Sequence, residues 1–376
     1  MSNIRLMKGN EALAEAVIRA GCKGYFGYPI TPQSEILEYL AEEGRQRGMV
    51  VMQVESELAA INMVYGAGGT GARVMTSSSS PGISLMQEGL SYIACSEIPC
   101  LVVNVNRGGP GLGTIQPSQS DYFQSTKGGG HGDYRLIVLA PASVQEMADM
   151  VYDAFDLADK YRNPVMILAD GALGQMMEKV EFREYNPEDH TIPKPWATVG
   201  KPPTRERNIL TSLHIQPEKM EEINRKLQAK YKFIAEEETK YQAVNIEDAD
   251  IVLVAYGLAA RIAQRAAELA RIHGIKVGVI RPITLWPYPY DILHVLREKI
   301  KGILVVEMNS GQMVEDVRLG IEGKIPVEFC GRMGGVIPSP EEIEQHLIGM
   351  AARLGVQTST KPVADKKSLT VEHETT

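Results

Sequence analysis

Short apolar runs alternate with amphipathic stretches over the first 180 residues of the chain. Six runs predict strands, at residues 24–27, 50–52, 73–76, 100–105, 136–139 and 165–168. Between them, apolar residues recur at helical spacing, as with Ile36, Leu37 and Leu40 after Pro32, which is expected to begin a helix. Strands that alternate with helices predict a parallel sheet with helices on both faces.

The alternation stops near residue 183 and resumes near residue 246. Prolines at 187, 193, 195, 202 and 203 predict an extended, wrapping segment, and a helix rich in Glu and Lys follows over 217–239. Strands are predicted again at 251–255, 276–280, 303–307 and 327–329, with a helix over 259–273. The chain is therefore expected to be an α/β protein with one domain over 1–182, a linker over 183–245, a second domain over 246–352 and a disordered polar tail over 353–376.

Charge and cysteine content narrow the range of partners. A formal net charge of −8 makes nucleic acid an unexpected partner. The N-terminal stretch lacks the apolar core of a secretory signal, and no apolar run approaches the length of a membrane span, so a cytoplasmic location is expected. The four cysteines form no Cys-x-x-Cys pair and are expected to be reduced thiols, so iron–sulfur clusters used by this protein would lie on another chain.

Chemically useful side chains follow three of the predicted strands. Thr31 lies in Gly-Tyr-Pro-Ile-Thr-Pro (residues 27–32), hydroxyls fill Ser-Ser-Ser-Ser-Pro-Gly (residues 77–82), and Arg107 begins Arg-Gly-Gly-Pro-Gly. Glu57 begins an apolar helix within Glu-Ser-Glu-Leu-Ala-Ala (residues 55–60), where Ser56 is the expected cap. Because open α/β sheets bind ligands at the carboxyl ends of their strands, these residues predict part of an active site.

Each of these residues also has a purely structural interpretation. Thr31 would by default cap the next helix, and Tyr28 would pack at the same turn. The helix dipole stabilises a negative charge in the first turn of a helix, so Glu57 needs no catalytic role to explain its position. Glu55 competes with it for any such role. Arg107 is equally consistent with a structural ion pair and with a carboxylate-binding site.

Two glycine-rich segments have different interpretations. Residues 66–71 match Gly-x-Gly-x-x-Gly, but a helical pattern precedes them and a strand follows, so we interpret them as a helix end and a tight turn rather than a nicotinamide site. The long segment 108–132 contains Leu112, Ile115, Tyr122 and Phe123, which favour an ordered lid or a partner contact.

The four motifs around Thr31, Glu57, Ser80 and Arg107 follow one another along the chain. Together with Val-Glu-Met-Asn-Ser-Gly-Gln (residues 306–312), they resemble the α subunit of the 2-oxoacid:ferredoxin oxidoreductases. The resemblance implies a pyrimidine-type thiamine-diphosphate-binding domain followed by a domain like the transketolase C-terminal domain. It implies that Glu57 contacts the pyrimidine ring, that Tyr28 and Ser80 lie beside the cofactor, and that Thr31 and Arg107 bind the substrate carboxylate. The implied reaction is oxidative decarboxylation of a 2-oxoacid, with transfer of the acyl group to coenzyme A.

Within the family, the chain looks most like the branched-chain (2-oxoisovalerate) type, on the basis of residues 77–82 and 109–119. The 2-oxoglutarate type typically has Thr-Ser-Gly-Pro-Gly at the first of these places and remains the alternative. A dicarboxylic substrate needs a second cation, and Arg107 and Lys127 are the only Lys or Arg between Thr76 and His131. A branched-chain monocarboxylic substrate is therefore expected.

The chain lacks the Gly-Asp-Gly motif with which thiamine enzymes usually hold Mg²⁺ and diphosphate. The resemblance therefore implies that a β subunit holds the diphosphate and metal, that γ and ferredoxin-like δ subunits complete the enzyme, and that [4Fe-4S] clusters lie on partner subunits. No metal site is expected on this chain, and ferredoxin is the expected electron acceptor. A non-catalytic assembly subunit and a nicotinamide dehydrogenase are the alternatives from other classes.

Overall fold

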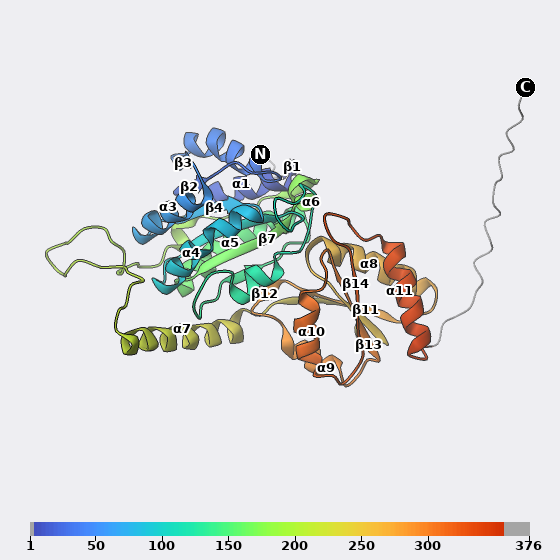
Figure 1. The fold of residues 1–376 in the computed structure, drawn as a ribbon. Coiled ribbons are helices and arrows are strands. Elements are labelled where there is room, and N and C mark those ends of the chain that lie inside the picture. Colours follow the sequence, from blue (N-terminus) through green and yellow to red (C-terminus); the bar gives the residue numbers. More distant parts are fainter. Residues whose placement is uncertain (1–3, 357–376) are drawn as a thin grey trace, which may run out of the picture.

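A computed structural model describes residues 4–356 of the chain. The first half supplies six strands of a seven-stranded sheet with the order β12-β6-β7-β5-β4-β2-β3, and Figure 1 shows this sheet beside the second one. Six of its strands pair in parallel, and each overlaps one of the six predicted runs. They are β2 (Gly24–Gly27), β3 (Val50–Gln53), β4 (Val74–Ser78), β5 (Cys100–Asn106), β6 (Ile137–Leu139) and β7 (Pro164–Asp170).

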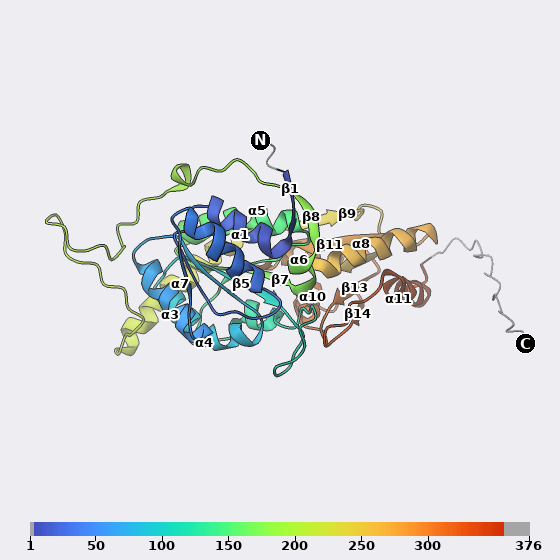
Figure 2. The same cartoon turned by 90° about the horizontal axis from the view of Figure 1, so that it is seen from above.

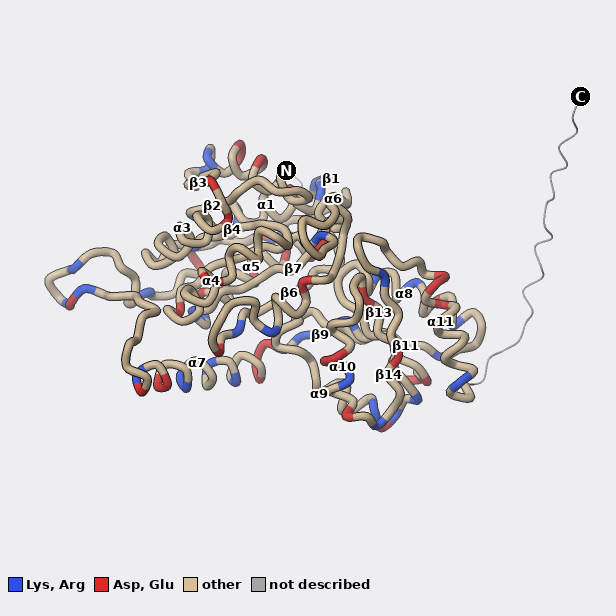
Figure 3. Tube along the Cα trace, in the orientation of Figure 1, with Lys and Arg blue, Asp and Glu red and all other residues tan. Residues whose placement is uncertain are grey.

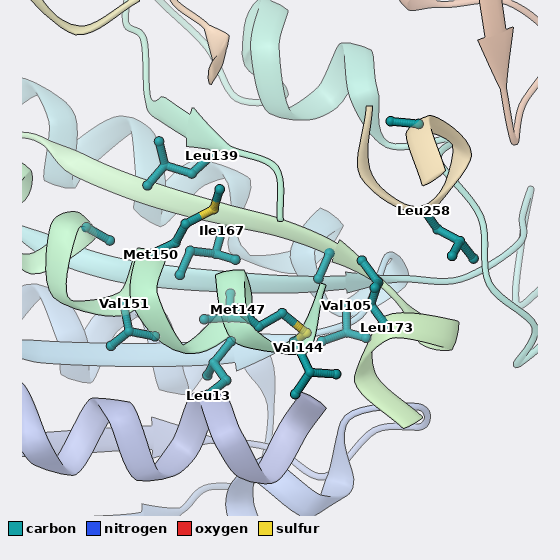
Figure 4. Packing of buried hydrophobic residues seen from close by; sticks show 14 of the residues in the cluster. Leu13, Val105, Leu139, Val144, Met147, Met150, Val151, Ile167, Leu173 and Leu258 are labelled. Carbon is teal, nitrogen blue, oxygen red and sulfur yellow. The ribbon is translucent and has the colours of Figure 1, made fainter. Parts of the chain in front are cut away.

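Helices cover both faces of this sheet, as the continuous apolar runs predict. One buried cluster joins α1 (Gly9–Arg19) and α5 (Val144–Tyr161) to Leu101 and Val103 of β5, and part of it is drawn in Figure 4. A second cluster joins α3 (Glu57–Gly69) and α4 (Pro81–Cys95) to Val102 of the same strand. Successive residues of β5 thus enter opposite cores, and this explains why the strand is apolar from Cys100 to Val103.

The second half forms a five-stranded sheet in the order β14-β13-β10-β11-β9. Its parallel strands are β10 (Ile251–Val254), β11 (Val277–Pro282), β13 (Gly302–Glu307) and β14 (Val327–Gly331), and β9 (Tyr241–Val244) joins the edge in the antiparallel direction. Residues of α8 (Gly257–Ile272) and α11 (Pro340–Arg353) belong to one buried cluster. Residues of α9 (Tyr290–Leu296) and α10 (Met313–Ile321) belong to the other.

Several short elements differ from the expectations. The strand β12 (Thr284–Trp286) comes from the second half of the chain but pairs with β6 in the first sheet. The strands β1 (Ile4–Lys8) and β8 (Met177–Glu181) form a separate antiparallel pair. The helix expected from Pro32 begins at Ser34 as α2 (Ser34–Tyr39) and continues as a π-helical turn over Leu40–Gly44.

The glycine-rich segment at 66–71 is a helix end, as predicted. Helix α3 ends at Gly69, and Gly71 has a φ of +86°, which favours glycine at this turn. Strand β4 then begins at Val74, so no strand precedes the segment and no helix follows it directly. This order is the reverse of the strand, loop and helix that a dinucleotide fingerprint requires.

The region between the two sheets runs along the outside of the first one (Figure 2). Apart from a 3₁₀ turn at Pro187–His190, it is irregular until α7 (Pro217–Glu238). This helix buries Leu227, Tyr231 and Ile234, and its other side carries the predicted charges (Figure 3). The tail expected to be disordered falls, from residue 357 onward, outside the described residues. No helix within residues 4–356 combines the length and apolarity needed to cross a bilayer.

Candidate active site

Glu57 is buried at the start of α3, beside the first turn of α4. Ser56 caps α3 as predicted, because its Oγ accepts a hydrogen bond of 3.2 Å from the Ala59 N–H. The Glu57 residue is 5% exposed, whereas Glu55 is exposed to solvent. The Ser78 hydroxyl donates to Glu57 Oε1 at 3.4 Å. Within residues 4–356, no Lys, Arg or His forms an ion pair with this carboxyl.

A glycine creates the space for this carboxyl. A Cβ atom on Gly82 would lie 2.4 Å from Glu57 Oε1 and 2.0 Å from Ser78 Oγ, well inside van der Waals contact. Gly82 is the second residue of α4, so the helix backbone itself lies against the carboxyl. The motif Ser-Pro-Gly therefore places a helix N-terminus, which favours negative charge, next to a buried glutamate.

Arg107 lies at the end of β5 and is 7% exposed. Its guanidinium donates through Nη1 to the Thr31 carbonyl at 2.8 Å and through Nη2 to the Leu112 carbonyl at 3.1 Å. The buried Nε atom has no hydrogen-bond partner, and no carboxylate lies within ion-pair distance in the described part of the chain. The structural ion pair considered for Arg107 is therefore absent from residues 4–356, and its charge has no counter-ion there.

Thr31 is brought to Arg107, although through its backbone rather than its hydroxyl. The residue is exposed, and none of the hydrogen bonds among residues 4–356 involves its side chain. Thr31 does not cap α2, whose cap residue is Gln33. Tyr28, at the end of β2, is 38% exposed rather than packed in the core. Both side chains thus remain accessible at the same edge of the sheet as Arg107.

Ser80 joins the ends of β4 and β5. Its Oγ accepts from the Arg107 N–H at 3.1 Å and lies 3.2 Å from the Asn106 side-chain oxygen, to which it can donate. Its own N–H donates to Asn104 Oδ1 at 3.2 Å. Ser80 therefore holds the backbone at Arg107 while also facing a cavity at the strand ends.

That cavity has a volume of about 540 Å³ and lies between the two halves of the chain. Its wall includes Ser80, Gly108, Pro110, Asp121, Asn309 and Gln312. Sequence reasoning did not identify Asp121, which accepts from Asn104 Nδ2 at 2.9 Å. Burial raises the pKa of the Asp121 carboxyl, and the hydrogen bonds from Asn104 and Ser80 oppose that shift. No motif or spacing marks Asp121, because its position depends on how the 108–132 segment folds.

Comparison with known proteins agrees with this fold. Residues 15–244 match the family model "Pyruvate flavodoxin/ferredoxin oxidoreductase, thiamine diP-bdg", and residues 249–343 match "Pyruvate:ferredoxin oxidoreductase core domain II". The chain is 52% identical over 331 residues to the ketoisovalerate oxidoreductase subunit VorB of Methanothermobacter marburgensis, covering 88% of this chain and 93% of that protein. It is 38% identical to the 2-oxoglutarate synthase subunit KorA of Methanocaldococcus jannaschii, covering 92% of this chain and all of that one.

A solved structure is similar over most of the chain. It is the 2-oxoglutarate:ferredoxin oxidoreductase from Magnetococcus marinus with 2-oxoglutarate, coenzyme A and succinyl-CoA bound, with a TM-score of 0.83 and 30% identity. The match covers 93% of this chain and 65% of that one. A split-gene transketolase, 15% identical with a TM-score of 0.54, shares the fold.

Fold and matched models together define an α/β protein with a thiamine-diphosphate-binding domain. More particularly, the chain belongs to the 2-oxoacid:ferredoxin oxidoreductases and is a subunit of that multi-subunit enzyme. The resemblance noted from the motifs is thereby confirmed for the family, and the nicotinamide dehydrogenase alternative is rejected.

The space beside Glu57 gives a direct prediction. Gly82→Ala should displace the Glu57 carboxyl and lower the free energy of unfolding by about 1–3 kcal/mol, as overpacking does. Gly66→Ala is the matched control, because a Cβ atom on that helical glycine meets nothing within 4 Å. It should stabilise the chain by about 0.4–1 kcal/mol. Thermal unfolding of the two variants makes the comparison, and equal midpoints would contradict the packing described here.

Proposed function

We propose that this chain supplies the pyrimidine and substrate-carboxylate half of a thiamine-diphosphate site in an enzyme that oxidatively decarboxylates a branched-chain 2-oxoacid. The products would be an acyl-CoA, carbon dioxide and reduced ferredoxin, and the location cytoplasmic. One observation carries the proposal most strongly. Among residues 4–356, the buried Glu57 carboxyl has no cation and the buried Arg107 guanidinium has no carboxylate, and both lie at one edge of the same parallel sheet.

Glu57 fits the pyrimidine side of the cofactor. A buried carboxyl is stabilised when it is hydrogen-bonded, and the one hydrogen bond that Glu57 accepts within residues 4–356 is long, at 3.4 Å. A ring nitrogen placed against it would supply the missing partner, and the carboxyl would hold a proton between its oxygen and that nitrogen. When bound, thiamine diphosphate supplies the nucleophile and the electron sink for decarboxylation. Tyr28 and Ser80, at the neighbouring strand ends, would form the walls around the ring.

Arg107 fits the carboxylate of the substrate. Two carbonyl contacts fix the orientation of its guanidinium, and its unused N–H groups remain available for a carboxylate. The Thr31 hydroxyl, which is accessible beside it, would donate a further hydrogen bond. Holding the substrate in this way fixes the keto carbon relative to the cofactor, which is a positioning contribution to the rate.

Two observations favour a branched-chain substrate over 2-oxoglutarate. Lys127, the other cation of the region, forms an ion pair with Asp316 and so is engaged away from a second substrate carboxylate. The relatives at 51% and 52% identity are named ketoisovalerate oxidoreductase subunits, whereas those named 2-oxoglutarate synthase subunits are 36–38% identical. The 2-oxoglutarate enzyme remains the second candidate, because the similar solved structure contains that substrate.

Partner subunits would complete the site. The Gly-Asp-Gly motif is missing from the sequence, and residues 4–356 contain no group of three or more His, Cys, Asp or Glu side chains that could hold a metal. A β subunit would then bind the diphosphate and Mg²⁺, and the [4Fe-4S] clusters would lie on the β and ferredoxin-like δ subunits, with γ completing the complex. A non-catalytic assembly subunit is the alternative from another class.

Substrate preference tests the function. The complex co-expressed with its neighbouring subunits should show the highest kcat/KM with 2-oxoisovalerate, compared with pyruvate and 2-oxoglutarate, when assayed with coenzyme A and a viologen acceptor. A preference for 2-oxoglutarate would keep the family and overturn the argument from Lys127. If the complex turned over none of the three 2-oxoacids, the result would favour a non-catalytic assembly role for this chain.

Glu57→Gln should leave assembly intact and lower kcat by about 10²–10⁴-fold, the usual contribution of a proton-transfer group. Glu55→Gln is the matched control, since that carboxyl is exposed two residues away, and its kcat should stay within about twofold of the parent complex. Steady-state kinetics on both complexes decide the point. Near-normal turnover by the Glu57 variant would remove this carboxyl from the mechanism.

A further inference from the structure

The segment that follows the 108–118 loop contacts the second half of the chain through several residues, among them Ser120 and Tyr122. Gln119 makes the densest set of these contacts. The Gln119 N–H donates to the Met308 carbonyl at 3.0 Å, and the Met308 N–H donates back to Gln119 Oε1 at 3.0 Å. Gln119 Nε2 donates to the Tyr256 carbonyl at 2.8 Å, and Asn309 Nδ2 donates to the Gln119 carbonyl at 2.8 Å. Gln119 is 3% exposed, so its backbone and side-chain amides are both satisfied within the protein.

Gln119 occupies a particular place in the second sheet. Tyr256 follows β10 and Met308 follows β13, and these two parallel strands are neighbours. The chain passes from β10 to β11 on one side and later reaches β13 on the other, so the strand order reverses between β10 and β13. The crevice at such a reversal is where open α/β sheets bind ligands. In this protein, residues of the first half fill that crevice.

The receiving turn is itself rigidly held. Glu307, which is fully buried, accepts from Asn309 Nδ2 at 2.9 Å and from the backbone N–H groups of Met313 and Val314 at 2.8 and 3.0 Å. These contacts fix the turn that links β13 to α10. The amide of Asn309 therefore lies between the Glu307 carboxylate and the Gln119 carbonyl, so the motif at residues 306–312 ends in a preformed receptor for Gln119.

Only a few contacts separate this receptor from Arg107. Pro117 forms a β-bridge with Arg107, and the Gly108 N–H donates to the Gln116 carbonyl at 2.9 Å. The loop then returns to Arg107 through the Leu112 carbonyl, which accepts from Nη2. A Cβ atom on Gly108 would lie 2.9 Å from the backbone of Gly334, so the second half also packs against the start of the loop.

We propose that Gln119 is a positioning residue for the 2-oxoacid site: by inserting into the crevice at the ends of β10 and β13, it holds the 108–118 loop so that the Arg107 guanidinium faces the substrate carboxylate. This inference rests on the proposed function. The second half of the chain then acts on substrate binding as well as on assembly. Losing the anchor should shift Arg107, and small displacements of a positioning group reduce rates strongly.

The test uses Gln119→Ala in the co-expressed complex. The KM for the 2-oxoacid should rise about tenfold or more, with a smaller change in kcat, because substrate binding loses orientation before the cofactor chemistry is affected. Gln119→Met, which keeps the length of the side chain and the backbone contacts, is the second variant and should change KM in the same direction. Its fuller packing preserves folding if the Ala variant is unstable.

Arg281→Gln is the matched control for loosening the two halves. Arg281 on β11 forms a bidentate pair with Glu146 on α5, at 2.7 and 2.8 Å, and this pair also joins the two halves but does not contact the 108–118 loop. The control should lower the thermal midpoint and leave the KM for the 2-oxoacid within about twofold. An equal rise of KM in the control and in the Gln119 variants would overturn the positioning role, as would an unchanged KM in both Gln119 variants.

Hydrogen exchange on the same complexes separates this inference from the proposed function. In both Gln119 variants, the amide of Gly108 should exchange about tenfold faster or more than in Arg281→Gln, since its bond to Gln116 loses the anchor. If the parent complex turns over no 2-oxoacid, the proposed function fails and the site interpretation falls with it. If the parent is active and Gly108 stays equally protected in all variants, the function stands and the role of Gln119 is overturned.

Discussion

Arg107 contacts the Thr31 carbonyl at 2.8 Å, and the arrangement of the site depends on that hydrogen bond. It joins the turn after β2 to the end of β5 across the intervening strand β4. A buried guanidinium is costly unless its N–H groups find acceptors, and here two carbonyls accept from Nη1 and Nη2, whereas Nε has no acceptor within residues 4–356. No carboxylate neutralises the charge within residues 4–356, so an incoming anion meets a cation that is already oriented. In the proposed site, the same contact that orders the two loops would also orient them toward a substrate carboxylate.

Burial on both sheet faces makes this edge rigid. Alternate residues of β5 pack into separate cores, one with α1 and α5 and the other with α3 and α4. The strands therefore cannot slide without opening both cores. At the rigid edge, Glu57 and Arg107 each lack a partner of opposite charge in the described chain. In the proposed site, ligands and partner subunits would complete the contacts of both groups.

Much of this architecture could be predicted from the sequence, because the six parallel strands are continuous apolar runs separated by helical patterns. The helix end at Gly69 and the capping by Ser56 also follow from local signals. The pairs β1–β8 and β12–β6 could not be predicted in this way. Their strands are three to five residues long, and only tertiary contacts select their partners. Residues 284–286 follow a strand of the second sheet but pair with the first one, and no local sequence pattern indicates this pairing.

Some residues of the candidate site could likewise be predicted from the sequence, and others could not. Glu57, Arg107 and Thr31 lie in motifs that follow predicted strands, so their proximity could be expected from parallel topology. That Thr31 would engage Arg107 through its carbonyl, and leave its hydroxyl accessible, depends on the path of the turn. Asp121 and Gln119 lie in a long segment without periodicity, and their contacts form only when that segment folds against the rest of the chain. Residues whose function depends on contacts between distant parts of a chain are the ones that sequence patterns miss.

We propose that this chain contains one part of a thiamine-diphosphate site and that a partner subunit contains the other. Titration calorimetry with thiamine diphosphate and Mg²⁺ tests it most directly, using the purified chain and the co-expressed complex side by side. A site divided in this way should give weak binding by the chain alone and binding at least about 10²-fold tighter by the complex, because the complex adds the diphosphate and metal contacts. Equally tight binding by the chain alone would contradict it.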